Sequence, residues 1–144
     1  MKALTDMTPD EIAQACADAM WEEDKTPAHL GMKIESIASG HAVVSMTVLD
    51  TMANGHDTCH GGYLFTLADT AFAYACNGHN NFADAMHCSI TFLAPGKRGD
   101  VLTATAKEIT RAGRNGIYDI TIHNQDGVRI AEFRGQSRTI KGSW

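Results

Sequence analysis

The most apolar stretch of the chain, residues 61–77, has the periodicity of a helix. Apolar residues recur there at spacings of three and four, namely Leu64, Ala68, Ala71, Phe72 and Ala75, which is the pattern of one helical face. The remaining faces are apolar as well, through Phe65, Leu67 and Ala73. A helix that is apolar on nearly all sides is normally buried, so we expect it at the centre of a domain or at a subunit interface.

A second helix is predicted near the N-terminus. Thr8 suits the N-cap, Pro9 suits the first position, and Glu11 completes a capping box. An apolar stripe then runs to about Asp24, formed by Ile12, Cys16, Ala19 and Met20. This helix is expected to be peripheral and to pack on a partner subunit.

Runs of alternating and β-branched residues predict the strands. Pro27 is expected to break the chain before a hairpin of strands at 30–38 and 42–49, and a loop is expected over 50–60. After the long helix, four strands are predicted in antiparallel succession through hairpins, at 85–93, 100–110, 117–124 and 128–140. The class is therefore α+β, with a single antiparallel sheet wrapped around one helix. We expect one domain over 1–144, of which 1–26 is a helical extension.

Composition excludes several classes of function. The 144-residue chain carries a net charge of −5, which disfavours binding to nucleic acid or to an anionic membrane surface. No signal peptide is apparent, and no apolar run is long enough to span a membrane. The four cysteines, Cys16, Cys59, Cys76 and Cys88, show no C-x-x-C spacing. Reduced thiols and a cytoplasmic location are expected.

One charged residue interrupts the apolar helix. Asp69 is the only Asp, Glu, Lys or Arg between Asp57 and Asp84, and a buried carboxylate is costly unless it is paired, hydrogen-bonded or functional. A structural Asp satisfied by the hydroxyls of Thr66 or Thr70 is one interpretation. The glycines at the helix start favour a catalytic one, because free N–H groups there stabilise a developing oxyanion.

Helix geometry places a limit on that catalytic interpretation. Gly61 and Asp69 are eight residues apart, about 12 Å along a helix axis. One carbonyl carbon cannot easily lie near both groups of one chain. Two such helices, antiparallel across a two-fold axis, would let each site take Gly61 from one subunit and Asp69 from the other.

Other groups of residues allow different chemistry. His56 and His60, with Cys59, could be a metal site, but they lie in a turn-rich loop without an evident third ligand. Cys59 beside His60 could be a nucleophile, although a packed small residue is the simpler interpretation. Arg111 and Arg114 lie at a predicted turn, where they are candidates to hold phosphates or are simply solvated.

The segments Asn54-Gly55-His56, Cys59-His60-Gly61-Gly62 and Leu67-Ala68-Asp69-Thr70-Ala71 form the most specific motif of the chain. Supporting segments are Phe92-Leu93-Ala94-Pro95-Gly96, Gly99-Asp100-Val101-Leu102, Tyr118-Asp119-Ile120 and Phe133-Arg134-Gly135. With these residues the chain resembles the hotdog-fold acyl-CoA thioesterases of the phenylacetic-acid-degradation (PaaI-type) branch. The resemblance covers most of the chain from Leu30 to Arg138.

The resemblance implies hydrolysis of acyl-CoA, with an aryl-acyl group such as phenylacetyl or a hydroxylated derivative, to free acid and CoA. It implies that the N–H of Gly61 polarises the thioester carbonyl, and that Asp69 of the neighbouring subunit activates water or attacks directly. Asn54 would position the water or the carboxylate, Thr70 would support Asp69, and His60 and Gly62 would contact substrate. The expected assembly is a homodimer or homotetramer, without a metal or a bound cofactor. Two alternatives remain, a hotdog enoyl-CoA hydratase or dehydratase that uses His60 with Asp69, and a non-catalytic acyl-CoA-binding module.

Overall fold

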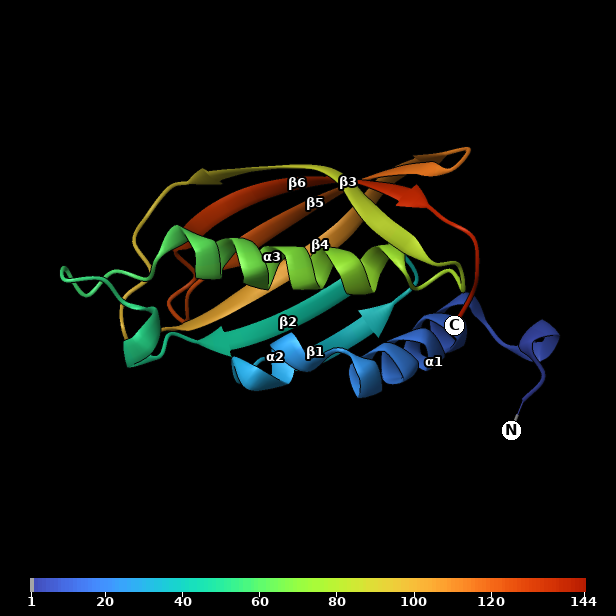
Figure 1. The fold of residues 1–144 in the computed structure, drawn as a ribbon, viewed down its shortest axis with the longest axis horizontal. Helices are drawn as coiled ribbons and strands as arrows, with labels where there is room; N and C mark the ends of the chain where they lie inside the picture. Colours follow the sequence, from blue (N-terminus) through green and yellow to red (C-terminus); the bar gives the residue numbers. More distant parts are fainter. Residues whose placement is uncertain (1) are drawn as a thin grey trace.

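One curved antiparallel sheet and one long helix make up the body of the protein (Figure 1). The computed structural model describes residues 2–144. The strands are β1 (Lys33–Ala38), β2 (His41–Thr47), β3 (Ala83–Phe92), β4 (Val101–Ala112), β5 (Asn115–His123) and β6 (Arg129–Thr139). Their order in the sheet is β1-β2-β4-β5-β6-β3, and every neighbouring pair is antiparallel. Helix α3 (Gly61–Cys76) lies across the concave face, so the expected sheet wrapped around one helix is confirmed.

The core lies between α3 and the middle strands. In the first half of β4 and along β5 every second residue is buried, and the large or apolar ones among them are Leu102, Ala104, Ala106, Tyr118, Ile120 and Ile122. Small residues let the helix approach the sheet closely. Gly135 on β6 shows this directly, because a Cβ there would lie 2.7 Å from the ring of Phe72. Phe72 in turn packs on Tyr118, with ring centroids 5.5 Å apart.

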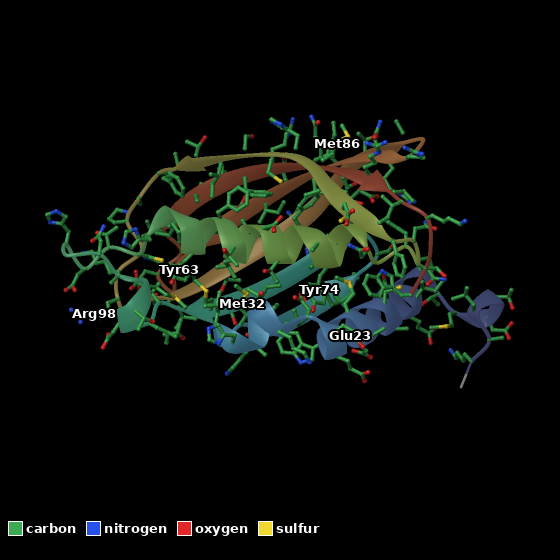
Figure 2. All side chains as sticks on the ribbon, in the orientation of Figure 1. Glu23, Met32, Tyr63, Tyr74, Met86 and Arg98 are labelled. Carbon is green, nitrogen blue, oxygen red and sulfur yellow. The ribbon has the colours of Figure 1, made fainter. Side chains whose placement is uncertain are left out.

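The topology corrects one part of the predicted strand arrangement. Strands β4, β5 and β6 do follow one another through hairpins, but β3 does not pair with β4. Instead, the chain crosses the sheet after β3, and β3 pairs with β6 at the edge, from Ala83↔Thr139 to Phe92↔Ala131. The error arose because sequence proximity was taken to mean hairpin pairing. Among the described residues no strand pairs with the other edge of β3, where Met86 projects outward (Figure 2).

The N-terminal segment forms two helices that flank β1. Helix α1 (Pro9–Glu23) has the predicted capping box, with Thr8 accepting from the backbone of Glu11 at 3.1 Å. Its buried residues are Ala13, Cys16, Ala17 and Met20, so the predicted stripe was wrong at Ala19, which is exposed. Pro27 does not break the chain there either. It is buried inside a short helix, α2 (Lys25–His29), and β1 therefore starts at Lys33 instead of residue 30.

Two short 3-10 turns complete the elements, η1 (Leu4–Asp6) and η2 (Asp50–Met52). The second lies in the predicted loop 50–60, which leads into α3. Across residues 2–144, none of the helices is long and apolar enough to cross a membrane.

Candidate active site

The loop before α3 holds the start of the helix in a fixed place. The backbone N–H of Cys59 donates to the carbonyl of Gly96 at 2.7 Å, and that of His60 donates to Met52 at 2.9 Å. Asn54 braces the same loop, because its Oδ1 accepts from the N–H groups of His56 (2.9 Å) and Thr58 (3.1 Å). Asn54 was expected to position water or a carboxylate. In this structure its amide oxygen shapes the loop.

Helix α3 begins with two free backbone donors. His60 at the N-cap offers no side-chain hydrogen bond to the helix. Within residues 2–144, the N–H groups of Gly61 and Gly62 have no hydrogen-bond partner, whereas the next two, from Tyr63 and Leu64, reach the carbonyl of His60. Unpartnered donors at a helix start attract negative charge. This end of α3 can therefore receive a carbonyl oxygen that becomes anionic during a reaction.

Glycine at position 61 lets an aromatic ring lie against the start of the helix. A Cβ at Gly61 would lie 2.7 Å from Cζ of Phe92, at the end of β3, whereas a Cβ at Gly62 would meet nothing within 4 Å. The sequence motif suggested that both glycines admit a ligand to the backbone. Packing of Phe92 is an additional reason for Gly61, and it was missed because it depends on the position of β3.

A cavity of about 410 Å³ opens at this helix start. Thr58, Cys59, Gly61 and Leu64 form one side, and the segment from Phe92 to Gly96 forms the other. Its walls are mostly apolar, and the free donors of α3 lie at its margin. An apolar acyl group bonded to a carbonyl is the kind of ligand that such a cavity can take.

Asp69 lies two turns further along α3 and is only partly buried. Among the described residues it has neither an ion-pair partner nor a hydrogen bond. The structural interpretation is wrong, because the hydroxyl of Thr66 donates to Gly62 (2.9 Å) and that of Thr70 to Thr66 (2.7 Å). Burial, and then the nearby charge of Asp24, raise the pKa of Asp69. A carboxylate without compensation is a candidate functional group.

Asp24 is a neighbour of Asp69 that sequence reasoning did not find. It lies where α1 ends and α2 begins. Close by is the hydroxyl of Tyr74, which is 1% exposed and has no well-formed hydrogen bond. Burial, and then the Asp24 charge, raise the pKa of this hydroxyl. In one chain Asp24 thus lies near both Asp69 and the hydroxyl of Tyr74, while Gly61 remains at the helix start.

The alternative chemistry of the loop finds little support. Cys59 is 3% exposed, and burial raises the pKa of its thiol to about 11. A protonated, buried thiol is a poor nucleophile. In the described part of the chain no three His, Cys, Asp or Glu side chains gather as a metal site, so His56 and His60 have no third ligand beside them.

The predicted phosphate contacts separate in the structure. Arg111 lies on β4 with its Nε 3.3 Å from the carboxylate of Glu108. Arg114 lines a cavity of about 530 Å³ that Arg138 and Lys141 also line, beside Asp84 at the start of β3. Sequence reasoning missed Arg138 and Lys141, because the register of β6 on β5, with Arg138 opposite Asn115, is what brings this end of the chain beside Arg114.

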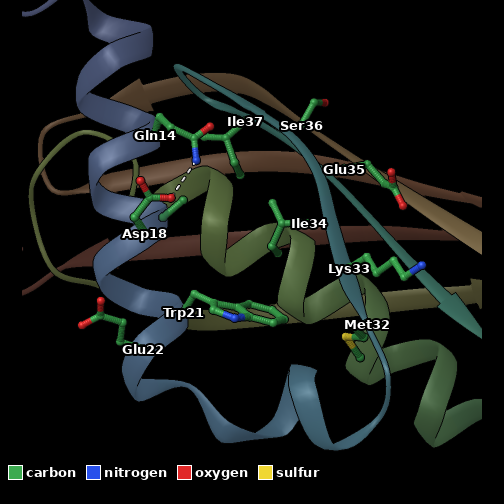
Figure 3. Close-up of a pocket in the computed structure, with 11 residues that line it drawn as sticks. Gln14, Asp18, Trp21, Glu22, Met32, Lys33, Ile34, Glu35, Ser36 and Ile37 are labelled. Carbon is green, nitrogen blue, oxygen red and sulfur yellow. Dashed lines mark hydrogen bonds between the residues drawn. The ribbon is translucent and has the colours of Figure 1, made fainter.

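A larger cavity lies elsewhere. It has a volume of about 630 Å³ and lies between α1 and β1, with Trp21 and Ile34 facing each other across it (Figure 3). Its lining includes none of the predicted site residues. The free backbone donors and the unpaired carboxylate therefore define the candidate site. The volume of a cavity alone would have pointed to a different place.

These features place the protein in a known class. A sequence model of the Thioesterase superfamily matches residues 56–131, the segment that holds Gly61, Asp69 and Phe92. The chain belongs to this superfamily and is an enzyme, a thioester hydrolase of the hotdog fold.

Individual relatives sharpen this assignment. The chain is 52% identical over 127 residues to the acyl-coenzyme A thioesterase PaaI of Escherichia coli K12, covering 88% of this chain and 91% of that protein. The structure of E. coli PaaI, from the phenylacetic acid degradation operon, superposes with a TM-score of 0.93 and 49% identity over 94% of this chain and 99% of that one. A hypothetical thioesterase of Streptococcus pneumoniae, solved with coenzyme A, superposes with a TM-score of 0.75 and 27% identity, covering 78% and 91%.

Proposed function

We propose that the protein hydrolyses acyl-CoA thioesters to the free acid and CoA, and that the acyl group is aromatic, such as phenylacetyl or a hydroxylated derivative. The observation that carries the proposal is the pair of free N–H donors at Gly61 and Gly62 together with the unpaired carboxylate of Asp69 on the same helix. The similarity to acyl-coenzyme A thioesterase PaaI supports the CoA ester as substrate. The place of that relative in phenylacetic acid degradation supports the aryl group.

The chemistry follows from these two groups. The N–H of Gly61 donates to the thioester oxygen and stabilises the negative charge that develops as the carbonyl carbon becomes tetrahedral. Asp69 removes a proton from water as the water oxygen bonds to that carbon. The C–S bond then breaks, and the proton passes to the CoA sulfur. In the second route, Asp69 attacks the carbon itself and the C–S bond breaks, so that CoA leaves as the thiolate. Water then attacks the Asp69 carboxyl carbon of the anhydride, which releases the acid and restores Asp69, and the proton from water passes to the CoA sulfur. Single turnover in H₂¹⁸O distinguishes the routes, because this attack carries the label into Asp69, whereas the first route places it in the acid. No cofactor takes part in either route.

We propose that two chains share each site. Gly61 and Asp69 are eight residues apart on one straight helix, about 12 Å, which is too far for one carbonyl carbon. Strand β3 runs antiparallel to α3, since Phe92 contacts Gly61 at one end and Ala83 bonds Asn77 at the other (Figure 1). Pairing two β3 edges across a two-fold axis therefore also sets two α3 helices antiparallel.

The shared site also determines where the two-fold axis of the dimer passes. Gly61 of one chain meets Asp69 of the other only if the axis passes near residue 65 of α3, towards the Phe92 end of β3. The free edge of β3, with Met86 about half exposed, supports this homodimer. Two such dimers would form the homotetramer.

The same arrangement accounts for the CoA phosphates. A thioester on Gly61 of one chain lies beside Asp69 of the other, and the remaining length of CoA can extend along that second chain towards the Cys76 end of α3. Arg114, Arg138 and Lys141 line the cavity at that end, and guanidinium groups bind phosphate well. We assign the phosphates to this cavity, with Arg111 at its margin.

The remaining site residues lie at the thioester end of the substrate. His60 and Gly62 contact that end, and Thr70 holds the turn of α3 next to Asp69. The four unpaired cysteines suit a reducing, cytoplasmic setting.

The deciding experiment measures thiol release from benzoyl-, phenylacetyl- and hexanoyl-CoA by the wild type and Asp69→Asn. Turnover that the variant loses supports the proposal, and a flat enoyl-CoA absorbance argues against hydration. No turnover on any ester, with the fold intact, would contradict it.

A second experiment tests the shared site. Inactive Gly61→Pro and Asp69→Asn chains are mixed, and their subunits are allowed to exchange. Recovery towards a quarter of wild-type activity is expected, because half of the dimers are mixed and each has one intact site. No recovery despite confirmed exchange would exclude the shared site.

A further inference from the structure

Phe92 is an aromatic residue that has no aromatic partner in the described chain. Of the five phenylalanines, the other four stack on or tilt against another ring, in the pairs Phe65–Phe133, Phe72–Tyr118, Phe72–Phe133 and Phe82–Trp144. Phe92 instead points the tip of its ring at Gly61 and is 53% exposed. Because this ring also lines the 410 Å³ cavity together with Gly61, it is placed to contact a ligand bound there.

The backbone that carries the Phe92 ring is held by hydrogen bonds to β6. β3 pairs with β6 up to the contact of Phe92 with Ala131. The next two N–H groups, from Leu93 and Ala94, donate to Ile130 at 2.9 and 3.2 Å. The ring therefore forms a wall of the 410 Å³ cavity whose position does not depend on a mobile loop.

The position of the Phe92 ring determines which part of a bound substrate it can contact. A carbonyl oxygen that accepts from Gly61 has its acyl carbon within the cavity, and the acyl group then runs beside the Phe92 ring. An aromatic acyl group gains an offset or edge contact with that ring, whereas an alkyl chain gains only apolar burial. The CoA portion leaves the carbonyl in the other direction and does not meet Phe92.

We infer that Phe92 is the specificity-determining residue of the enzyme, which selects planar aromatic acyl groups at Gly61. The inference rests on the proposed function and deepens it. It names the side chain that distinguishes aryl from alkyl substrates, and it gives Gly61 a second role, as the residue small enough to let that ring reach the carbonyl site.

The test compares kcat/KM for phenylacetyl-CoA and hexanoyl-CoA in the wild type, Phe92→Leu and Leu93→Ala. Leu93 is the matched control, since it lines the same cavity and is also 53% exposed, but carries no aromatic ring. We expect Phe92→Leu to lower the aryl-to-alkyl ratio about fivefold, the size of an aromatic pair contact. Leu93→Ala should leave the ratio within about twofold, because it removes no aromatic contact. Inhibition by free CoA should be equal in all three proteins.

An unchanged ratio in Phe92→Leu, or an equal change in Leu93→Ala, would overturn the inference while leaving the hydrolase intact. A wild type that cleaves neither ester would instead contradict the proposed function. A second pair of variants tests the contact itself. Gly61→Ala keeps the N–H but places a methyl group against the ring, so activity should fall, and adding Phe92→Ala should restore at least threefold of it. No restoration, with both proteins folded, would show that the ring does not limit position 61.

Discussion

The two ends of α3 differ in how their polar groups are satisfied. At the C-terminal end, Asn77 is 4% exposed, and its amide nitrogen donates to Ala73 and Ala83, both at 3.0 Å. Its oxygen accepts from the N–H of Ala83 at 2.9 Å and from Trp144 at 3.1 Å. At the N-terminal end, the N–H groups of Gly61 and Gly62 have no partner within residues 2–144.

A second network strengthens the contrast. Next to the C-terminal end, Oε1 of Glu108 accepts from Tyr118 and bonds His79, each at 2.7 Å. Buried polar groups that are fully satisfied stabilise and specify a fold. Groups left free at a cavity are available to a substrate. One helix thus separates the two tasks, with stability concentrated at its C-terminal end and chemistry at its start and middle.

The largest effect should come from Asp69→Asn. Loss of a positioned base or nucleophile should reduce kcat by about 10²–10⁴-fold, measured by thiol release. Stability at neutral pH should be equal or higher, because burial raises the pKa of Asp69 and its charged form opposes folding. Asp18→Asn on α1, where the side chain is exposed, is the control. Equal activity in both variants would remove Asp69 from the mechanism.

Asn77→Ala should lower stability and leave activity nearly unchanged. It leaves the N–H and the carbonyl of half-buried Ala83 without their side-chain partners, whereas the carbonyl of Ala73 keeps the backbone N–H of residue 77, so the free energy of unfolding should fall by about 3 kcal/mol. The value of kcat should change less than threefold, since the C-terminal end takes no part in chemistry. Urea unfolding and thiol release measure the two quantities. A large loss of kcat with unchanged stability would reverse the assignment of the two ends.

Glu108→Gln should have a smaller effect that depends on pH. Burial raises the pKa of Glu108, but hydrogen bonds from Tyr118 and His79 outweigh it, so the pKa is lowered overall. Stability from the ionised form is therefore present above the unfolded pKa and is lost as pH falls through the folded pKa. The variant should be less stable than wild type by about 1 kcal/mol at pH 7, and the difference should vanish in acid. A difference that persists at pH 3 would contradict this account.

Asp24→Asn should produce the smallest change. The charge of Asp24 adds to burial in raising the pKa of Asp69, so activity needs a higher pH than an ordinary carboxylate would. Removing the charge should shift the acidic limb of the kcat/KM profile to lower pH. Glu22→Gln, on the exposed face of α1, should leave the limb in place. A shift to higher pH in Asp24→Asn would exclude this electrostatic contribution.

Local patterns predicted the elements well and their long-range contacts poorly. The capping box at Thr8 and the apolar periodicity of 61–77 were enough to place α1 and α3. The position of β3 depends on the whole sheet, because β3 pairs with a strand whose partner residues lie about 40–60 positions away. The hairpin assumption therefore failed there.

The candidate site divides in the same way. Gly61 and Asp69 could be identified from the sequence, because both lie on one predicted helix and their separation can be counted along it. The contact of Phe92 with Gly61, the approach of Asp24 to Asp69, and the gathering of Arg138 and Lys141 near Arg114 are all tertiary. No local signal at Asp24 separates it from other helix-end acids. Pro27 lies in the first turn of α2, where a missing N–H costs no helical hydrogen bond.

The remote pairing of β3 also bears on the order of folding. The hairpins β4–β5 and β5–β6 close over short loops, whereas β3 must meet β6 across a much longer separation, and such contacts form late. Until β3 docks, the edge of β6 is open to other chains and Phe92 is away from Gly61, and an open edge invites aggregation. We therefore expect activity to return in refolding only with the last, concentration-dependent phase, in which one strand completes the sheet, the cavity and the dimer together.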